Sequence, residues 1–253
     1  MAPKCRCHDG ISRQLIIARV TVSVSPRRGR RNRATKRGGL KMAGNAGTAL
    51  IAIDVQVDFC PGGALEVAEG HEVVPLVNAM AEAYPVRVLT QDWHPESHAS
   101  FAANHAGAEP FSVKEMPYGS QVLWPSHCVQ GSPGAQFHDA LRTDLFHAVI
   151  RKGFRPEIDS YSAFFENDRE TRTGLDGYLR ERGVDRLVLV GLATDFCVAW
   201  SALDARRLGY AVTVVEEAAR AIDLDGSLGA ARTDMRAAGV NLVETVASIE
   251  ATS

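Results

Sequence analysis

The feature that most constrains the fold is a regular alternation of short apolar runs and longer amphipathic segments, which begins at Thr48. The apolar runs are TALIAIDV (48–55), VRVLTQDW (86–93), HAVIRKG (147–153), LVLV (187–190), AVTVVEEA (211–218) and VNLVET (240–245). Their lengths and their β-branched residues are typical of buried strands. Helical patterns fall between them at 70–83, 168–182, 194–208 and 225–238. Strands that alternate with helices predict an α/β fold, a parallel sheet with helices on both faces.

The chain shows no internal repeat and no linker after this pattern begins, so residues 46–253 are predicted to form one domain. Residues 94–140 are rich in His, Pro, Gly and Ser and are predicted to be irregular. In parallel sheets, ligands bind beyond the carboxyl ends of the strands. The residues expected at that edge are Asp54, Asp92 with His94, Lys152 and Cys197.

The stretch LVLVGLATDFCVAW (187–200) places a cysteine just after a buried strand. Gly191 is expected to end the strand, and Thr194 or Asp195 can cap a new helix. Cys197 then falls in the first turn, where the helix dipole favours a thiolate. The alternative, which this stretch alone leaves open, is a small buried apolar residue.

Asp54, Lys152 and Cys197 together form a set that can perform nucleophilic catalysis. A thiol needs a base that removes its proton, and a carboxylate can be that base. A lysine can stabilise the thiolate and tune the aspartate. An Asp–Lys ion pair at a strand end is a simpler explanation of either residue alone, but it does not account for the cysteine at the same edge.

The segment TQDWHPESHASF (90–101) carries one carboxylate and two imidazoles, and LWPSHCVQG (123–131) adds a third imidazole. Single histidines are usually surface or core residues, but this combination suits zinc, iron or manganese. We therefore predict one divalent metal ion, most simply zinc. The predicted ligands are Asp92, His94, His98 and His127.

Five motifs in order identify a resemblance: AIDVQVDFCPGGAL, TQDWHPESHASF, LWPSHCVQGSPGAQFH, RKGF followed by DSYSAF, and VGLATDFCV. Over residues 48–245 the chain resembles the nicotinamidase family of isochorismatase-like cysteine hydrolases. This resemblance implies a metal-dependent amidase that converts nicotinamide to nicotinic acid and ammonia, with activity on pyrazinamide as well. It also implies the parallel α/β fold of that superfamily.

The resemblance also implies roles for individual residues. Asp54 matches the catalytic aspartate, Lys152 the lysine and Cys197 the nucleophile, while the metal ligands match those predicted above. A cis peptide bond is expected before Ala193, whose N–H would form an oxyanion hole with that of Cys197. The residues expected to line the substrate pocket are Phe59, Trp124 and Tyr161, with Leu192 near them.

Two features depart from the family pattern. Val57 stands where the family usually has Asn, which removes a local hydrogen bond after Asp54 without touching a catalytic role. The second is the N-terminal extension, residues 1–45, which has no counterpart and is expected to be disordered. It could be a nucleic-acid-binding arm or a transit peptide, but we favour translation from Met42.

The charge distribution bears on possible partners. Residues 1–41 hold twelve Lys or Arg and one acid, Asp9, whereas the rest of the chain carries a net charge of about -13. An acidic body argues against nucleic acid as the main partner, because phosphate contacts need clustered positive charge. The expected partner is a small-molecule substrate, with homo-oligomerisation left open.

The cysteines and the apolar runs bear on location. Five cysteines without a disulfide-like spacing are typical of a reducing cytoplasm. No uncharged apolar run reaches membrane-spanning length, and a secretory signal is not expected.

Three rival functions were weighed. The nearest is another amidase of the superfamily, acting on a carbamoyl or ureido substrate, but such relatives generally lack the DWHPxxH motif. An isochorismatase would usually lack the cysteine. An inactive metal-binding or interaction module is disfavoured because the triad and the metal motif are both intact.

Overall fold

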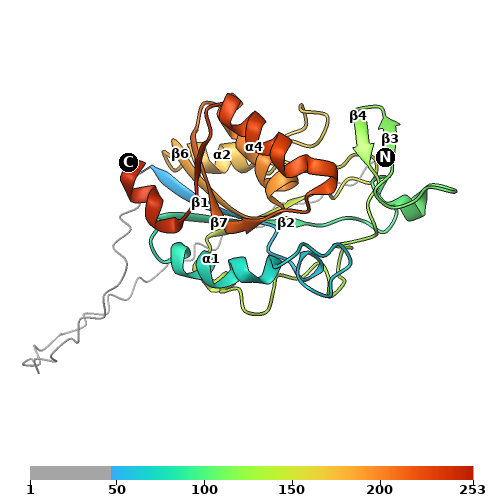
Figure 1. The fold of residues 1–253 in the computed structure, drawn as a ribbon, viewed down its shortest axis with the longest axis horizontal. Coiled ribbons are helices and arrows are strands. Elements are labelled where there is room, and N and C mark those ends of the chain that lie inside the picture. Colours follow the sequence, from blue (N-terminus) through green and yellow to red (C-terminus); the bar gives the residue numbers. More distant parts are fainter. Residues whose placement is uncertain (1–46, 253) are drawn as a thin grey trace, which may run out of the picture. The chain divides into compact units, whose positions relative to one another are not determined.

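Six parallel strands form the central sheet of the computed structural model, which describes residues 47–252 (Figure 1). Across the sheet the order is β5 (Ala148–Lys152), β2 (Val86–Asp92), β1 (Thr48–Ile53), β6 (Arg186–Leu192), β7 (Ala211–Arg220) and β8 (Asn241–Val243). Every neighbouring pair is parallel. The six predicted strands and the parallel α/β architecture are therefore confirmed.

Strand β1 shows why the apolar runs become strands that are covered on both faces. All six of its residues are buried. Leu50 and Ala52 belong to one apolar cluster, and Ala49, Ile51 and Ile53 belong to a second. Successive side chains of a strand point to opposite faces, so the two clusters are the cores on the two sides of the sheet.

The helices that cover the sheet within residues 47–252 are α1 (Val73–Ala81), α2 (Leu175–Arg180), α3 (Ala199–Arg207) and α4 (Ser227–Ala237). Figure 1 shows α1 on one face and α2 and α4 on the other. The buried side chains of α1 lie in the first core, and those of the other three helices lie in the second. Pro75 falls in the first turn of α1, where a missing N–H removes no intrahelical bond.

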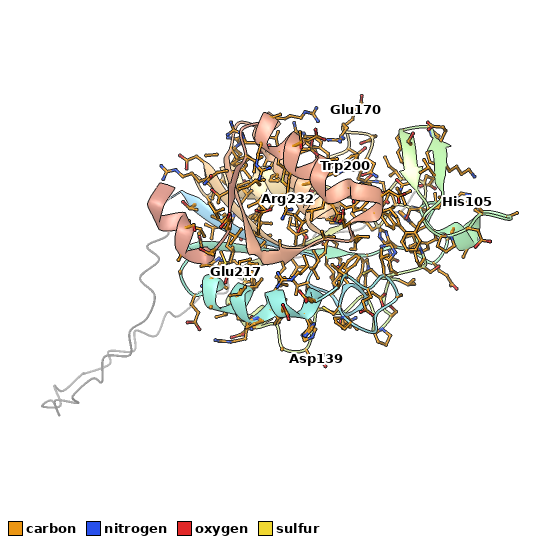
Figure 2. The ribbon with its side chains drawn as sticks, viewed as in Figure 1. His105, Asp139, Glu170, Trp200, Glu217 and Arg232 are labelled. Carbon is orange, nitrogen blue, oxygen red and sulfur yellow. The ribbon has the colours of Figure 1, made fainter. Side chains whose placement is uncertain are left out.

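The stretch predicted to be irregular, 94–140, contains an antiparallel hairpin that the sequence pattern did not reveal. Its strands are β3 (Val113–Met116) and β4 (Gly119–Val122). Both are short and mostly exposed, so they lack the apolar run that marks a buried strand. His105, labelled in Figure 2, lies beside this hairpin, with Nδ1 2.8 Å from Lys114 Nζ.

The helix predicted over 168–182 is wrong in its first half, because α2 begins only at Leu175. The Asp168 carboxylate accepts hydrogen bonds from the backbone N–H groups of Glu170 and Thr171. This local turn competes with a helix for the same backbone donors. Gly174, with a φ of 101°, then leads into α2.

The carboxyl ends of β5, β2, β1 and β6 are neighbours at one edge of the sheet. Asp92 and Lys152 are direct partners in the register of β2 and β5. Asp54 follows β1, and Cys197 follows β6. The predicted convergence of these residues at one edge is therefore confirmed.

The predicted N-terminal extension, residues 1–45, lies outside the described residues. The structure describes the domain that follows it from Gly47 onward. Within residues 47–252, no helix has the length and apolar character needed to cross a membrane.

Candidate active site

Asp54 is fully buried directly after β1, with its backbone in the left-handed region at a φ of 46°. Thr90 of β2 holds its carboxylate: Thr90 Oγ1 donates to Asp54 Oδ1 at 2.6 Å and accepts the Asp54 N–H at 3.1 Å. Asp54 Oδ2 lies 2.8 Å from Lys152 Nζ. One carboxylate oxygen is thus tied to the sheet, and the other faces the lysine.

Lys152 contacts the other polar side chains at this edge of the sheet. Its fully buried ammonium forms ion pairs with both Asp54 and Asp92. It also donates to the Ser160 carbonyl at 2.9 Å and lies 3.4 Å from Cys197 Sγ. Burial alone would lower the pKa of Lys152, but the two carboxylates raise it well above its usual value. Lys152 therefore stays protonated and provides a fixed positive charge beside the thiol.

Cys197 lies in a π-helical turn, Thr194–Val198, that leads into α3. The prediction of a helix start here is correct, but the predicted cap is wrong, because no side chain caps this turn. The Asp195 carboxylate instead accepts the backbone N–H groups of Ile222 and Asp223, at 3.1 and 2.8 Å. Asp195 therefore fastens the loop after β7 to the cysteine-bearing turn.

Gly191 does not end the strand as predicted, because β6 continues to Leu192. Its φ is 109°, and the register between β6 and β7 shifts at this point. A Cβ at Gly191 would lie 2.1 Å from the Ile53 carbonyl oxygen, so only glycine fits here. Strands β1 and β6 therefore approach closely at this point. Beyond their ends, a carboxylate oxygen of Asp54 lies within 4.8 Å of Cys197 Sγ.

The environment of Cys197 shifts the pKa of its thiol upward. Burial, the largest effect, raises the pKa of Cys197 well above its usual value; Lys152 opposes this, and Asp54 adds to it. Desolvation thus opposes the attraction of the lysine, and the thiolate expected at the helix start stays a prediction. Burial also raises the pKa of Asp54 to about 6, against the pull of Lys152. A carboxylate with this pKa beside a thiol is a suitable general base.

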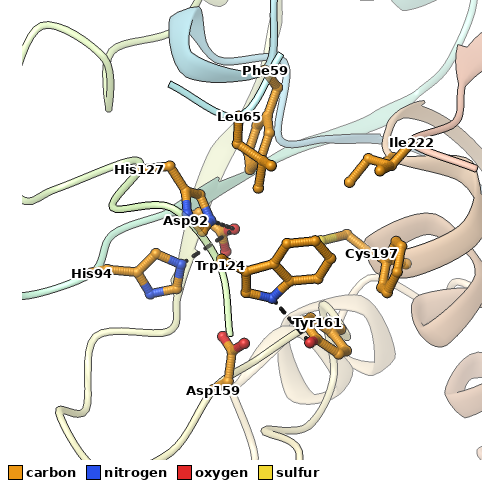
Figure 3. A pocket seen from close by; sticks show the side chains of 12 residues that line it. Phe59, Leu65, Asp92, His94, Trp124, His127, Asp159, Tyr161, Cys197 and Ile222 are labelled. Carbon is orange, nitrogen blue, oxygen red and sulfur yellow. Dashed lines mark hydrogen bonds and ion pairs between the residues drawn. The ribbon is translucent and has the colours of Figure 1, made fainter. Parts of the chain in front are cut away.

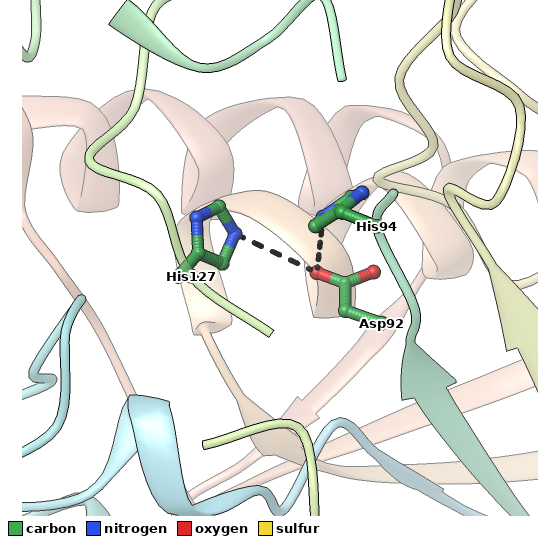
Figure 4. Close-up of side chains that lie close together, drawn as sticks. All are labelled: Asp92, His94 and His127. Atoms are coloured by element: carbon green, nitrogen blue, oxygen red, sulfur yellow. Dashed lines mark ion pairs between the residues drawn. The ribbon is translucent and has the colours of Figure 1, made fainter. Parts of the chain in front are cut away.

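Asp92, His94 and His127 form a buried group that could hold a metal ion, with their ligand atoms within 4.8 Å of one another (Figure 4). Nε2 of His94 and of His127 lie 3.5 and 4.0 Å from Asp92 Oδ2. Each Nδ1 lies 2.8 Å from a backbone carbonyl oxygen, that of Gly153 for His94 and that of Pro125 for His127.

This arrangement fits the needs of a metal ion. Because a carbonyl oxygen only accepts, each Nδ1 carries a proton, and Nε2, on the side of Asp92, is the nitrogen that can bind a metal ion. Burial and the neighbouring His94 lower the pKa of His127 to about 4, which favours the neutral form that binds metals. Two imidazoles and one carboxylate are a donor set that zinc and related divalent cations accept.

The fourth predicted ligand, His98, lies in a different group, with His94 and Asp159. Its ring is already held on both sides: Nε2 lies 3.1 Å from the Ile158 carbonyl oxygen, and Nδ1 lies 2.7 Å from Ser100 Oγ. The structure thus brings three of the four predicted ligands to one point and ties His98 to the loop after β5. The His98 ring still lies beside this group, with its centroid 4.3 Å from that of His94, and its role as a ligand stays a prediction.

A cavity lies between the cysteine and the metal-site candidates (Figure 3). Its walls include the predicted Phe59, Trp124 and Tyr161, and also Leu65, Asp159, Phe196 and Ile222, which sequence reasoning missed. Asp92, His94 and His127 lie at one end, and Cys197 lies at the other; Ala193 also lines the cavity. The aromatic rings meet edge to face, as Trp124 and Phe196 do with centroids 4.9 Å apart.

Two predictions concern residues that precede the π-helical turn. Leu192 is fully buried in the first core and is absent from the cavity wall, so its predicted place near the substrate is not observed. Its side chain packs beside Gly70 instead. The expected cis peptide bond between Leu192 and Ala193 is present.

Two buried polar residues beside the site carry a signal in the sequence. Thr90 and Gln56 are polar residues next to strand ends, and both are fully buried. Gln56 clamps β1 to β2, since its Nε2 donates to the Asp92 carbonyl and its Oε1 accepts the Asp92 N–H, both at 2.8 Å. A polar residue such as Thr90 or Gln56 at the end of a mostly apolar strand was the sequence signal that could have identified them as part of the site. Asp159, Phe196 and Ile222 had no comparable signal, because only the tertiary fold brings them to the cavity.

The fold and the site define a class: an α/β protein with the buried cysteine, aspartate and lysine that a cysteine hydrolase requires. The comparison with protein families agrees, since residues 48–247 match the model of the isochorismatase domain. The chain belongs to the isochorismatase family.

Known relatives narrow this further. The nicotinamidase of Acinetobacter baylyi is 51% identical over 206 residues, which are 81% of this chain and 95% of that protein. The solved nicotinamidase and pyrazinamidase of Acinetobacter baumanii is 52% identical, with a TM-score of 0.78, and covers 79% of this chain and 96% of its own. The pyrazinamidase of Pyrococcus horikoshii, solved in complex with zinc, is 35% identical, with a TM-score of 0.64. The match covers 78% of this chain and 99% of that protein's chain.

Proposed function

We propose that the protein is a nicotinamidase, an amidohydrolase that converts nicotinamide to nicotinic acid and ammonia and also acts on pyrazinamide. The observation that carries this proposal is a single cavity with the Asp54–Lys152–Cys197 cluster at one end and a buried Asp–His group at the other. Its aromatic walls suit a flat heteroaromatic ring. The names of the similar proteins support the same substrate.

The first half of the reaction makes a thioester. Asp54 takes the proton of the Cys197 thiol, and the sulfur attacks the carboxamide carbon. Lys152, 3.4 Å from Sγ, stabilises the negative charge on sulfur as the proton leaves. Asp54 then returns the proton to the departing nitrogen, so that ammonia leaves and the acyl group stays on sulfur.

The oxyanion of the tetrahedral intermediate needs donors that are fixed before the reaction. We assign this role to the backbone N–H groups of Ala193, which directly precedes the π-helical turn, and of Cys197 within that turn. Such donors typically contribute a factor of about 10²–10³ in kcat each.

The second half regenerates the enzyme. Asp54, again ionised, removes a proton from water, and the water oxygen attacks the thioester carbon. The carbon–sulfur bond breaks, nicotinic acid leaves, and the sulfur recovers a proton from Asp54. Atoms balance, since one water enters and one acid and one ammonia leave.

One divalent metal ion, most simply zinc, would be held by Asp92, His94 and His127, with His98 beside them. When bound, it supplies a Lewis acid for the ring nitrogen of the substrate, which orients the ring and draws electrons from it. Asp92 also forms an ion pair with Lys152, so the same carboxylate touches both ends of the site. Phe59, Trp124 and Tyr161 would hold the ring between them.

We place this reaction in the cytoplasm. Cys60, Cys128 and Cys197 are unpaired, as expected in a reducing compartment. Homo-oligomerisation, which the sequence left open, stays a prediction.

An ammonia-release assay on nicotinamide, with metal content measured on the same preparation, tests the proposal. We expect turnover together with about one metal ion per chain. A metal-loaded protein that releases no ammonia from nicotinamide or pyrazinamide would overturn it.

A further inference from the structure

We propose that Gln121 is a positioning residue for the substrate cavity, which holds the wall residues Asp159 and Tyr161 in place from the β3–β4 hairpin. The inference rests on the proposed function, because it is the binding of a flat ring in this cavity that the positioning serves. Gln121 itself is absent from the cavity wall and would act through its two partners.

Gln121 is the one buried residue of β4, and its exposed fraction is 0%. A buried amide is costly unless its donors and acceptor are satisfied. Its Nε2 lies 2.7 Å from Asp159 Oδ2 and 2.8 Å from both the Tyr161 hydroxyl and the Val122 carbonyl oxygen, so its two hydrogens are shared among three acceptors. Its Oε1 accepts from Asn167 Nδ2 at 3.1 Å. The amide of an otherwise exposed strand therefore faces inward onto two residues of the cavity wall.

The network extends from these contacts to a third wall residue. Trp124 Nε1 donates to the Tyr161 hydroxyl at 3.0 Å, the bond drawn in Figure 3. Asn167 holds the backbone of the same loop, since its Oδ1 accepts the Tyr161 N–H at 3.0 Å and its own N–H donates to the Asp159 carbonyl at 2.8 Å. Gln121 thus joins Asp159 to Tyr161, and Tyr161 in turn holds Trp124.

Asp159 gives this network a consequence for binding. Its side chain is almost fully buried, with one oxygen accepting from Gln121 and the other from the Ser160 N–H at 2.8 Å. Without the Gln121 donor, the buried Asp159 carboxylate would lose one of these two hydrogen bonds. It would then shift toward the histidines of its group, His94 and His98, or toward the substrate. Either shift narrows or tilts the space for the ring.

The test exchanges the donor and the acceptor. Gln121→Glu replaces the amide donor with a second carboxylate facing Asp159, and we expect the KM for nicotinamide to rise by about tenfold or more, with kcat changed by less than about threefold. Adding Asp159→Asn supplies an amide that can donate in the reverse direction. The double variant Q121E/D159N should recover most of the lost KM, which a merely structural role would not produce.

Gln136→Ala is the matched control, because that exposed glutamine contacts only the Ser132 carbonyl through its side-chain amide. Its KM and kcat should equal those of the wild type. A normal KM in Q121E, or a loss that D159N leaves unrepaired, would overturn the proposal. If Q121E is too unstable to assay, a KM of the double variant no better than that of D159N alone would overturn it as well. A wild type without nicotinamidase activity would remove the proposed function itself.

Discussion

The two ends of the cavity are built in different ways. At the cysteine end, Asp54 and Lys152 stand at the ends of sheet strands, and Cys197 follows a third strand within one π-helical turn. At the metal end, only Asp92 belongs to a strand, while His94 and His127 lie on loops whose backbone carbonyls orient the rings. The wall between the two ends depends on the Gln121 network.

This difference separates the chemistry from the recognition of the substrate. Groups that transfer protons must keep their distances, and a parallel sheet fixes strand ends more firmly than loops do. Groups that recognise the substrate lie on loops, which tolerate sequence change more readily. Asp92 connects the two ends, because it touches Lys152 on one side and both histidines on the other.

The largest effect is expected at the cysteine end. Cys197→Ala removes the only atom that can attack the amide in this account, so kcat should fall by at least about 10³-fold while the fold persists. Cys128→Ala is the matched control, because that thiol is also buried and has no assigned role. Ammonia release and a thermal melt measure both variants. Equal inactivity of the two would remove the support for Cys197 as the nucleophile.

The acid side of the pH profile should also report the cysteine end. The pKa of Asp54 is raised by burial to about 6, and the carboxylate is the active form. kcat/KM should therefore be level above that pH and fall by about tenfold for each unit below it. Thr90→Val removes a hydrogen bond to Asp54 that lowers this pKa, so it should move the acid limb to higher pH. If T90V leaves the acid limb of the kcat/KM profile at the same pH, that limb reports the titration of a group other than Asp54.

The smallest effect is expected from the N-terminal extension. Deletion of residues 1–41 should leave kcat/KM and the melting temperature nearly unchanged, because the family match begins at residue 48 and every residue that lines the cavity follows it in the chain. Activity and a thermal melt of the shortened chain provide the check. A fall of many degrees in the melting temperature would contradict this expectation.

The same contrast explains what the sequence could predict. The six strands and the convergence of Asp54, Asp92, Lys152 and Cys197 followed from apolar runs and from the rule that parallel strands end at one edge. The hairpin β3–β4 was missed because its residues are mostly exposed and carry no apolar pattern.

Loop geometry accounts for most of the remaining differences. The DWHPESH spacing gave no way to see that His98 lies with Asp159 and Ile158, and nothing in the sequence showed that Gln121 of β4 contacts Asp159. Residue types at strand ends can be read from a sequence, whereas contacts between two long loops depend on the tertiary fold. The pKa of the Cys197 thiol also depends on burial, which the helix-start pattern does not report.

The most direct test of the division between chemistry and recognition is a cycle of two enzymes and two amides. Benzamide keeps the carboxamide and the ring shape of nicotinamide but lacks the ring nitrogen. The wild type should show a kcat/KM for benzamide lower by about a hundredfold or more. His94→Ala, with its metal content measured, should lose metal and nicotinamide turnover but change the benzamide rate much less, because both changes remove the same interaction. Equal losses on both amides would contradict the account, since the metal end would then support the fold or the cysteine end rather than recognise the ring.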